Sequence, residues 1–269
     1  MQIRYVVSTM VFWWRENNLS FEQECRFLSS LGFGVELWPN IKDQNECRYD
    51  RRNWSRLVDA VGDMLVSMRS RIGCPTLEQW SEQIECAKLL GADIVTDLRN
   101  LRIRDDVELD PSGAGDFAAE VVKLAEENDV KLCLETGSLQ TLRDVREKFE
   151  SIWYCLDTGY ANLDPQFGFN RYVDDLAERV AHLHLTDNYG RIDDHEPPGL
   201  RGGIPRKHWE YLLNALRKYD NDVIGSLEMC PCMPAVMIRQ ASEFLFDELK
   251  WPNRPQKQPG YAGVAYNPA

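Results

Sequence analysis

Strand-like and helix-like segments alternate along the whole of this 269-residue chain. Short runs that are apolar, or apolar at every second position, predict strands at residues 3–8, 34–38, 64–68, 92–98, 131–135, 152–157, 180–186 and 223–228. Segments with helical signals follow them at residues 21–31, 52–61, 76–90, 116–128, 139–149, 171–179, 208–218 and 235–249. Two of these helices begin with the spacing of a capping box, at Ser20–Gln23 and Thr76–Gln79. Strict alternation of this kind is typical of a parallel sheet covered by helices.

No linker or shift in composition divides the alternating segments, which favours one domain. Eight β/α units in about 250 residues predict an α/β fold, a single (β/α)₈ TIM barrel. We place the barrel at residues 1–251 and read residues 252–269, which are rich in Pro and Gly, as an extended tail. A doubly wound open sheet is the alternative, but no Gly-rich phosphate-binding loop follows the first strand. An active site would then lie at the C-terminal ends of the strands.

The charge and the cysteines limit the partners and the compartment. The net charge of −12 argues against nucleic acid as a partner, because proteins that bind it usually present a basic face. No run approaches the roughly 20 apolar residues of a membrane span. The apolar N-terminal stretch has neither a basic leader nor a small-residue cleavage site, so we interpret it as the first strand. Eight scattered cysteines without a C-x-x-C pair are expected to be reduced thiols of a cytoplasmic protein.

Four predicted strands end near side chains that commonly bind metal ions. Glu135, Asp157 and Glu228 end the fifth, sixth and eighth strands, and His184 lies near the end of the seventh. These strands are neighbours in a barrel, so the four side chains would converge at its mouth. Three carboxylates in one place would repel one another unless they are protonated or neutralised, which predicts a bound divalent cation. Mn²⁺ suits three carboxylates and one imidazole best, with Mg²⁺, Co²⁺ or Zn²⁺ as alternatives.

The alternation of the seventh strand places His182 on the same face as His184, one pleat earlier. A hydrogen-bonded core histidine is the alternative interpretation for either ring. We expect His184 to bind the metal and His182 to support the substrate site from behind it.

Several motifs resemble those of the xylose-isomerase-like TIM barrels. This superfamily of sugar isomerases and epimerases also includes the bacterial apurinic-site endonucleases. The matching motifs are GVELW at 34–38, LETG at 134–137, CLDTGYANL at 155–163, HLHLTD at 182–187, DDHEPPG at 193–199 and GSLEM at 225–229. The likeness to the ketose 3-epimerases implies that Glu135, Asp157, His184 and Glu228 hold the metal. It also implies that the two glutamates serve as the acid/base pair.

The sequence departs from the patterns of that superfamily in two ways. Tyr160 stands in DTGY where many members have DTGH; that His contacts substrate in the epimerases and binds zinc in the endonucleases. Asp193 and His195 match the DxH of the endonucleases, which also need histidines on earlier strands, and this chain has no His before residue 182. A three-zinc site is therefore not expected, and Tyr160 and His195 are candidate substrate contacts.

The resemblance implies a divalent-metal-dependent sugar isomerase or epimerase that transfers a proton through an enediolate. The metal would act as a Lewis acid on a carbonyl and an adjacent hydroxyl. One glutamate would remove the proton beside the carbonyl and the other would return it. Glu36, Arg99 and Asp187 are further candidate substrate contacts. An ion pair away from the substrate is the alternative for Glu36 and Arg99, and loop capping is the alternative for Asp187.

Three other functions remain as alternatives. The same enolate chemistry supports a lyase or dehydratase acting on a keto-sugar or a 3-keto-glycoside. Phosphodiester cleavage is disfavoured by the charge and the missing histidines, and a non-catalytic scaffold by the four intact candidate ligands. The expected partner is a small carbohydrate, without a phosphate because no phosphate-binding cluster stands out, and not nucleic acid or membrane. A homo-oligomer is compatible with the sequence.

Overall fold

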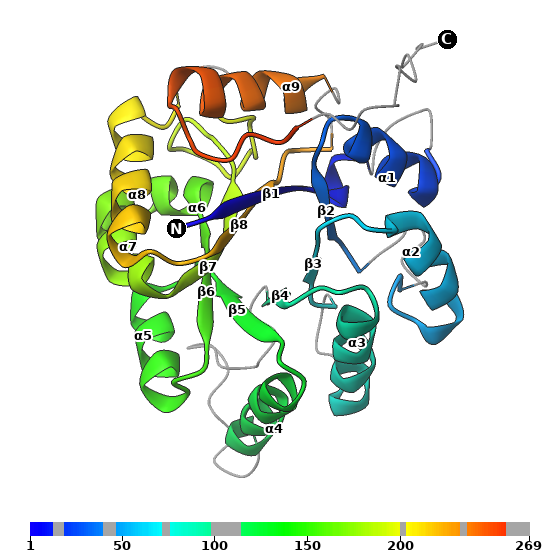
Figure 1. Cartoon of the computed structure of the whole chain (residues 1–269). Coiled ribbons are helices and arrows are strands. Elements are labelled where there is room, and N and C mark those ends of the chain that lie inside the picture. Colours follow the sequence, from blue (N-terminus) through cyan, green and yellow to red (C-terminus); the bar gives the residue numbers. More distant parts are fainter. Residues whose placement is uncertain are drawn as a thin grey trace.

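The chain folds into a closed barrel of eight parallel strands (Figure 1). The computed structural model describes residues 1–12, 19–39, 47–71, 76–97, 114–199, 203–231 and 236–256. Each strand pairs with the next in sequence order, and β8 pairs with β1 to close the barrel. The strands are β1 Ile3–Ser8, β2 Gly34–Leu37, β3 Val66–Arg69, β4 Ile94–Asp97, β5 Lys131–Glu135, β6 Trp153–Asp157, β7 Val180–Leu185 and β8 Val223–Leu227. The predicted single-domain (β/α)₈ fold is confirmed.

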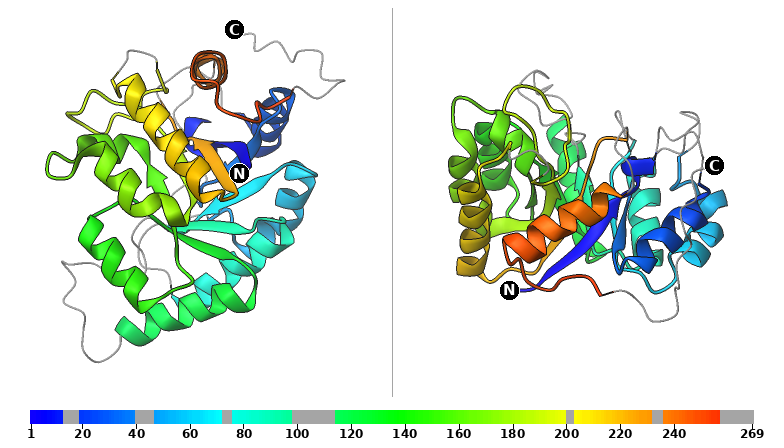
Figure 2. Two further views of the ribbon diagram at one scale, coloured as in Figure 1. Left: turned by 60° about the vertical axis from the view of Figure 1, so that its left-hand side comes forward. Right: turned by 90° about the horizontal axis from the view of Figure 1, so that it is seen from above.

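Helices surround the barrel on its outside (Figure 2). They are α1 Phe21–Ser30, α2 Trp54–Val61, α3 Leu77–Leu89, α4 Ala114–Glu127, α5 Leu139–Lys148, α6 Thr158–Leu163, α7 Gly168–Leu176, α8 Arg206–Tyr219 and α9 Met237–Ser242. Short helical turns are η1 Thr9–Phe12, η2 Arg51–Asn53 and η3 Ala177–Arg179, and a π-helical turn, η4 Glu243–Glu248, continues α9. Both predicted capping boxes are present, at the starts of α1 and α3.

One helix was not predicted. The six-residue α6 begins directly after β6 and is too short to show a helical period. Its first turn is held by Asp157, whose Oδ1 accepts a hydrogen bond from the backbone N–H of Tyr160 at 2.9 Å. The carboxylate that ends the strand therefore also caps the helix that follows it.

The hydrophobic core has two parts. One joins the strands to the helices, and the other consists of strand residues alone. A large cluster of buried side chains joins strands to helices and includes the fully buried Trp80, Tyr172 and Trp209. A small second cluster consists of Val6, Ile94, Cys133, Cys155, Ala181 and Ile224. Next to Cys155, the interior becomes polar, because Ser67 on β3 is hydrogen-bonded to His182 on β7 at 3.1 Å. One pleat further along these strands lies the candidate site.

Candidate metal centre

The four predicted metal ligands lie together at the C-terminal mouth of the barrel. Glu135 and Asp157 are the last residues of β5 and β6, His184 is on β7, and Glu228 directly follows β8. All four side chains are buried. One potential ligand atom from each lies within 4.8 Å of the others. Because neighbouring parallel strands end side by side, the fold brings these residues together as the sequence predicted.

The imidazole of His184 lies at the centre of this group. Its Nδ1 is 2.8 Å from Oε1 of Glu135, 3.2 Å from Oε2 of Glu228 and 3.9 Å from Oδ2 of Asp157. Burial acts to lower the pKa of His184. The neighbouring Cys155 and the carboxylates around the ring outweigh burial and raise that pKa well above its usual value. In the metal-free chain the ring is therefore cationic and donates a proton toward the oxygens that converge on Nδ1.

The carboxyl groups of the site differ in the direction of their pKa shifts. Burial acts to raise the pKa of Glu135, but Arg69 and His184 together lower it to about 2. For Asp157 and Glu228 the effect of burial prevails and their pKa values are raised. Three carboxyl groups confined away from water thus depend on nearby positive charge to stay ionised.

Hydrogen bonds fix the orientation of Asp157. Its Oδ1 accepts hydrogen bonds from the backbone of Tyr160 and, at 3.1 Å, from Oγ1 of Thr186. Oδ2 is left to face His184. The hydroxyl of Thr186 also accepts the N–H of Gly159 at 3.0 Å, and a Cβ on Gly159 would lie only 2.3 Å from that oxygen. The Gly of the DTGY motif is required by this close approach.

Glu36 lies behind His184 and not at the mouth of the site. This fully buried residue of β2 uses Oε1 to accept a hydrogen bond from Nε2 of His184 at 3.0 Å. Its Oε2 accepts one from the hydroxyl of Ser226 at 2.7 Å. Because both oxygens are engaged inside the barrel, these contacts favour the ion-pair alternative for Glu36 over a contact with a substrate hydroxyl. A carboxylate on the far nitrogen of a ligand histidine fixes its tautomer and orientation.

We expect Glu36→Gln to weaken divalent metal binding by about 10–100-fold, the usual effect of removing such a partner. The substitution keeps the shape of the side chain but removes the charge that holds the His184 ring. Isothermal titration with Mn²⁺ measures the effect, with Ser226→Ala as a control that keeps the glutamate. Equal affinity in wild type and Glu36→Gln would show that Glu36 does not prepare the histidine.

Arg69 is the residue of the site that the sequence analysis missed. It ends β3, one residue beyond the strand that was predicted. Its Nη2 donates to Oε2 of Glu135 at 2.6 Å and its Nη1 donates to Oε1 of Glu228. The inward alternation that starts at Ser67 would have found it, had the strand been extended to residue 69.

His182 is a core histidine. It is fully buried beneath His184, and the ring centroids are 5.2 Å apart. Its nitrogens are hydrogen-bonded to Oγ of Ser67 at 3.1 Å and to Sγ of Cys155 at 3.3 Å. Burial lowers the pKa of His182 to about 3, so the ring is neutral. These contacts favour the expected supporting role of His182 behind His184 over a direct contact with substrate.

Asp187 holds the loop between β7 and α8. Its Oδ1 accepts the backbone N–H groups of Asn188 at 2.8 Å and Ile204 at 2.7 Å, and its Oδ2 accepts that of Gly199 at 3.0 Å. Its own backbone pairs with Glu196. These contacts favour the loop-capping alternative over substrate contact.

We expect Asp187→Ala to destabilise this loop, because the buried N–H groups of Asn188 and Ile204 and the part-buried N–H of Gly199 would lose their acceptor. Each buried group left without an acceptor costs about 1–3 kcal/mol. Hydrogen exchange of the Asn188, Gly199 and Ile204 amides measures the effect. Unchanged protection of these amides would refute the capping role.

His195 stands at the edge of the site. Its Nε2 is 3.3 Å from Oδ2 of Asp193, and its Nδ1 is 3.4 Å from the backbone oxygen of Glu228. Burial acts to lower the pKa of His195, but the hydrogen bond to Asp193 and the charges of Glu228 and Asp157 raise it to about 10. The backbone φ of 47° is unusual for a non-glycine residue, and such backbone strain concentrates at functional sites.

The other two predicted substrate contacts are Tyr160 and Arg99. Tyr160 on α6 is half-buried, and its ring packs edge-on against that of Tyr172 with centroids 6.2 Å apart. Arg99 lies outside the described residues.

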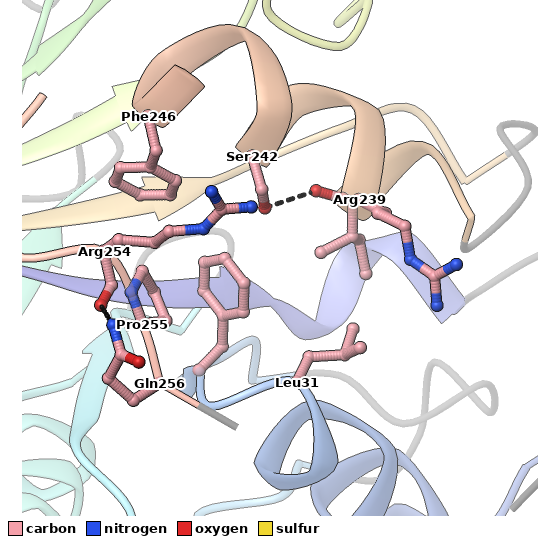
Figure 3. Close-up of a pocket in the computed structure, with 9 residues that line it drawn as sticks. Leu31, Arg239, Ser242, Phe246, Arg254, Pro255 and Gln256 are labelled. Atoms are coloured by element: carbon pink, nitrogen blue, oxygen red, sulfur yellow. Dashed lines mark hydrogen bonds between the residues drawn. The ribbon is translucent and has the colours of Figure 1, made fainter. Parts of the chain in front are cut away.

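A separate cavity lies away from these carboxylates, between α1 and the segment of α9 and η4 (Figure 3). Its volume is about 350 Å³, and its lining consists of Leu31, Phe33, Ile238, Arg239, Ser242, Phe246, Arg254, Pro255 and Gln256. Phe33 directly precedes β2, so the cavity is at the N-terminal side of that strand. Arg254 is paired with Asp247 at 2.5 Å. In barrels of this type the N-terminal side serves stability and not catalysis.

The chain belongs to the xylose isomerase-like TIM barrel family, whose sequence pattern matches residues 75–247. Among solved structures, a D-tagatose 3-epimerase-like protein superimposes with a TM-score of 0.71 at 18% identity, covering 91% of this chain and 96% of the other. An L-ribulose 3-epimerase gives 0.64 at 16% identity, covering 90% and 86%. Endonuclease IV from Thermus thermophilus gives 0.56 at 17% identity, covering 91% and 99%.

The superpositions establish the shared fold, and at these low sequence identities they do not define the reaction. Comparison of the sequence with curated proteins gives no significant match. Within the described part of the chain, every helix is too short or too polar to cross a lipid bilayer.

Proposed function

We propose that this protein is a divalent-metal-dependent sugar isomerase or epimerase. The observation that carries the proposal is the convergence of Glu135, Asp157, His184 and Glu228 at the mouth of the barrel. The family, together with the epimerases among the solved structures that share this fold, supports a carbohydrate substrate.

The donor set fits a divalent metal ion. Three carboxylates and one imidazole converge from four neighbouring strands. Among the described residues, none forms a hydrogen bond to the buried Oε2 of Glu228, which lies in an ion-pair contact 3.2 Å from Nδ1 of His184. Glu135, Asp157, His184 and Glu228 would hold the ion, with Mn²⁺ as the proposed metal and Mg²⁺, Co²⁺ or Zn²⁺ as alternatives. When bound, it would supply Lewis-acid polarisation of a substrate carbonyl and an adjacent hydroxyl.

The residues of the chain supply the proton transfer. Glu135 and Glu228 come from β5 and β8, so they approach the mouth from two sides. One removes the proton from the carbon beside the carbonyl, and the other returns a proton to the resulting enediolate. His195, cationic and partly exposed next to Glu228, is a proposed substrate contact that would have to exchange its hydrogen bond to Asp193 for one to a substrate oxygen. Tyr160 and Arg99 remain proposed substrate contacts.

Metal content and turnover test this function together. Protein purified without chelator is analysed for metals, along with Glu135→Ala, and assayed on a panel of ketoses and keto-glycosides in D₂O. We expect metal in the wild type only, and deuterium beside the carbonyl of recovered sugar. No uptake by the wild type under saturating Mn²⁺, Co²⁺ or Zn²⁺ would overturn the proposal. Turnover without deuterium would instead indicate shielded exchange or a hydride shift.

The same panel separates the alternatives. Loss of water or of a glycosidic leaving group from the substrate would assign the protein to the lyases. We expect no incision of an abasic DNA duplex, given the net charge of −12 and the absence of any histidine before His182. Metal-dependent incision that is lost in His184→Ala would reverse that expectation.

The cytoplasm is the proposed compartment, in line with the six described cysteines, all of which are free thiols in the structure. A thiol titration of the unfolded protein checks this point.

A further inference from the structure

A guanidinium lies among the carboxylates of the candidate metal centre. Arg69 reaches them from β3, which stands opposite β7 and His184 in the closed eight-stranded barrel. One of its terminal nitrogens donates to Glu135 and the other donates to Glu228. A single side chain thus joins the two proposed acid/base residues.

Each glutamate divides its oxygens between Arg69 and His184. Oε1 of Glu135 is 2.8 Å from Nδ1 of His184, and its Oε2 is 2.6 Å from Nη2 of Arg69. Oε2 of Glu228 is 3.2 Å from Nδ1 of His184, while its Oε1 bonds to Arg69. Both carboxylates therefore lie between two positive groups that the chain itself provides.

The guanidinium is held by contacts that need no metal. Arg69 is 3% exposed and its Cζ lies 4.3 Å from the centre of the Trp38 ring. The hydroxyl of Tyr49 is 2.6 Å from the backbone oxygens of both Arg69 and Leu37, which ties β3 to β2 beneath the stacked pair. A planar fork that bonds two carboxylates and stacks on an indole is specific to arginine.

We propose that Arg69 is the resident counter-ion of this site. It neutralises Glu135 and Glu228 while no metal is bound, so that the empty site does not destabilise the barrel. Its permanent positive charge also stays beside the carboxylates that a divalent cation would use, and like charges repel. Arg69 therefore lowers metal affinity and makes the metal exchangeable. This inference rests on the proposed metal site and concerns how that site is regulated.

The test compares wild type with Arg69→Met, which keeps an unbranched apolar stem but removes the guanidinium and its charge, and with Arg69→Lys, which keeps the charge. Arg48→Met is the matched control. Arg48 is also buried, is paired with the buried Glu24 at 3.4 Å and lies over the ring of Phe21, outside the carboxylate cluster. Electron paramagnetic resonance of free Mn²⁺ gives the dissociation constants. Thermal unfolding is followed in EDTA and in excess Mn²⁺.

We expect wild type to unfold cooperatively in EDTA. Arg69→Met should bind Mn²⁺ at least about tenfold more tightly than wild type does, because the charge that repels the ion is gone. Arg69→Met should also melt at a lower temperature than wild type in EDTA, and Mn²⁺ should reduce the difference. Arg69→Lys should keep an affinity close to that of wild type. Arg48→Met should keep the wild-type affinity and lose the same stability in both conditions.

Several outcomes would overturn the proposal. If wild type binds Mn²⁺ and Arg69→Met binds it equally or less tightly, the arginine does not compete with the metal. An equal loss of stability with and without Mn²⁺ would make Arg69 an ordinary packing residue. If Arg69→Met does not fold in either condition, the other two proteins decide the question. Much tighter Mn²⁺ binding by Arg69→Lys than by wild type, or non-cooperative unfolding of wild type in EDTA, would then refute the role of Arg69 as counter-ion. If wild type takes up no metal, the proposed function is refuted instead. The melting temperatures of wild type and Arg69→Met in EDTA would still test whether Arg69 neutralises Glu135 and Glu228.

Discussion

Glu135→Gln and Glu228→Gln are each expected to lower turnover by about 10²–10⁴-fold, the usual contribution of a positioned general base. Glutamine preserves the approximate shape of the side chain but cannot take up a proton from carbon. Steady-state kinetics on the sugar that the substrate panel identifies measure the effect. Metal content is determined on the same samples, so that loss of the base is distinguished from loss of the ion.

Glu24→Gln is the control for both variants, because Glu24 is as buried as the catalytic candidates but is paired with Arg48 on another part of the barrel. It should retain wild-type turnover. Near-normal turnover in both Glu135→Gln and Glu228→Gln would remove the glutamates from the mechanism. A large loss in only one of them would indicate that a different group returns the proton.

The fold could be predicted because its signal is repeated eight times. Each short apolar run of the sequence became a strand, and two of them, β1 and β5, have the predicted limits. The ligand positions followed from the same pattern. Glu135 and Asp157 end their strands, and in a parallel barrel all strands end at one mouth.

The surroundings of the ligands could not be predicted in the same way. Which nitrogen of His184 faces Glu36 depends on the closure of the barrel, which brings β2 and β7 within reach across the interior. Strand periodicity showed that Glu36 lies inside a strand but did not show what lies opposite. Its burial behind the histidine, and not at the mouth, is a property of the closed sheet.

Arg69 escaped prediction for a local reason and a general one. The third strand was predicted to end at Met68, so Arg69 lay outside the alternation that was considered. Charged side chains are seldom fully buried unless they are paired, and the partners of Arg69 are 66 and 159 residues away in the sequence. A charge buried in a barrel can therefore be recognised only when its distant counter-charges are known.

The hydrogen bonds of Asp157 also explain how the helix after β6 is attached to that strand. Asp157 must present one oxygen to the site, and its second oxygen is used by Tyr160 and Thr186. The local chain is thus arranged around the orientation of one carboxylate. A motif of small and polar residues after the strand indicated this site, although it carried no helical period.

His184→Ala should both abolish metal uptake and lower the free energy of unfolding of the metal-free chain by about 3–5 kcal/mol, the cost of leaving a buried charge without its partner. The ring contacts Glu36, Glu135 and Glu228. After its removal Arg69 would still offset the latter two, and His195 would still lie 3.9 Å from Glu228, but Glu36 would lose its contact with the ring. Urea denaturation in EDTA measures the stability, and elemental analysis measures the metal.

His182→Ala provides the contrast, because it removes the same kind of ring from the same strand, fully buried but neutral. We expect it to leave a cavity and to lose stability equally in EDTA and in Mn²⁺, while the metal still binds. In His184→Ala, by contrast, Mn²⁺ should not restore stability, since the ion loses its only nitrogen ligand among the four candidate residues. If His184→Ala is as stable as wild type in EDTA, or still takes up metal, then the imidazole is neither the counter-charge of the three glutamates nor a ligand.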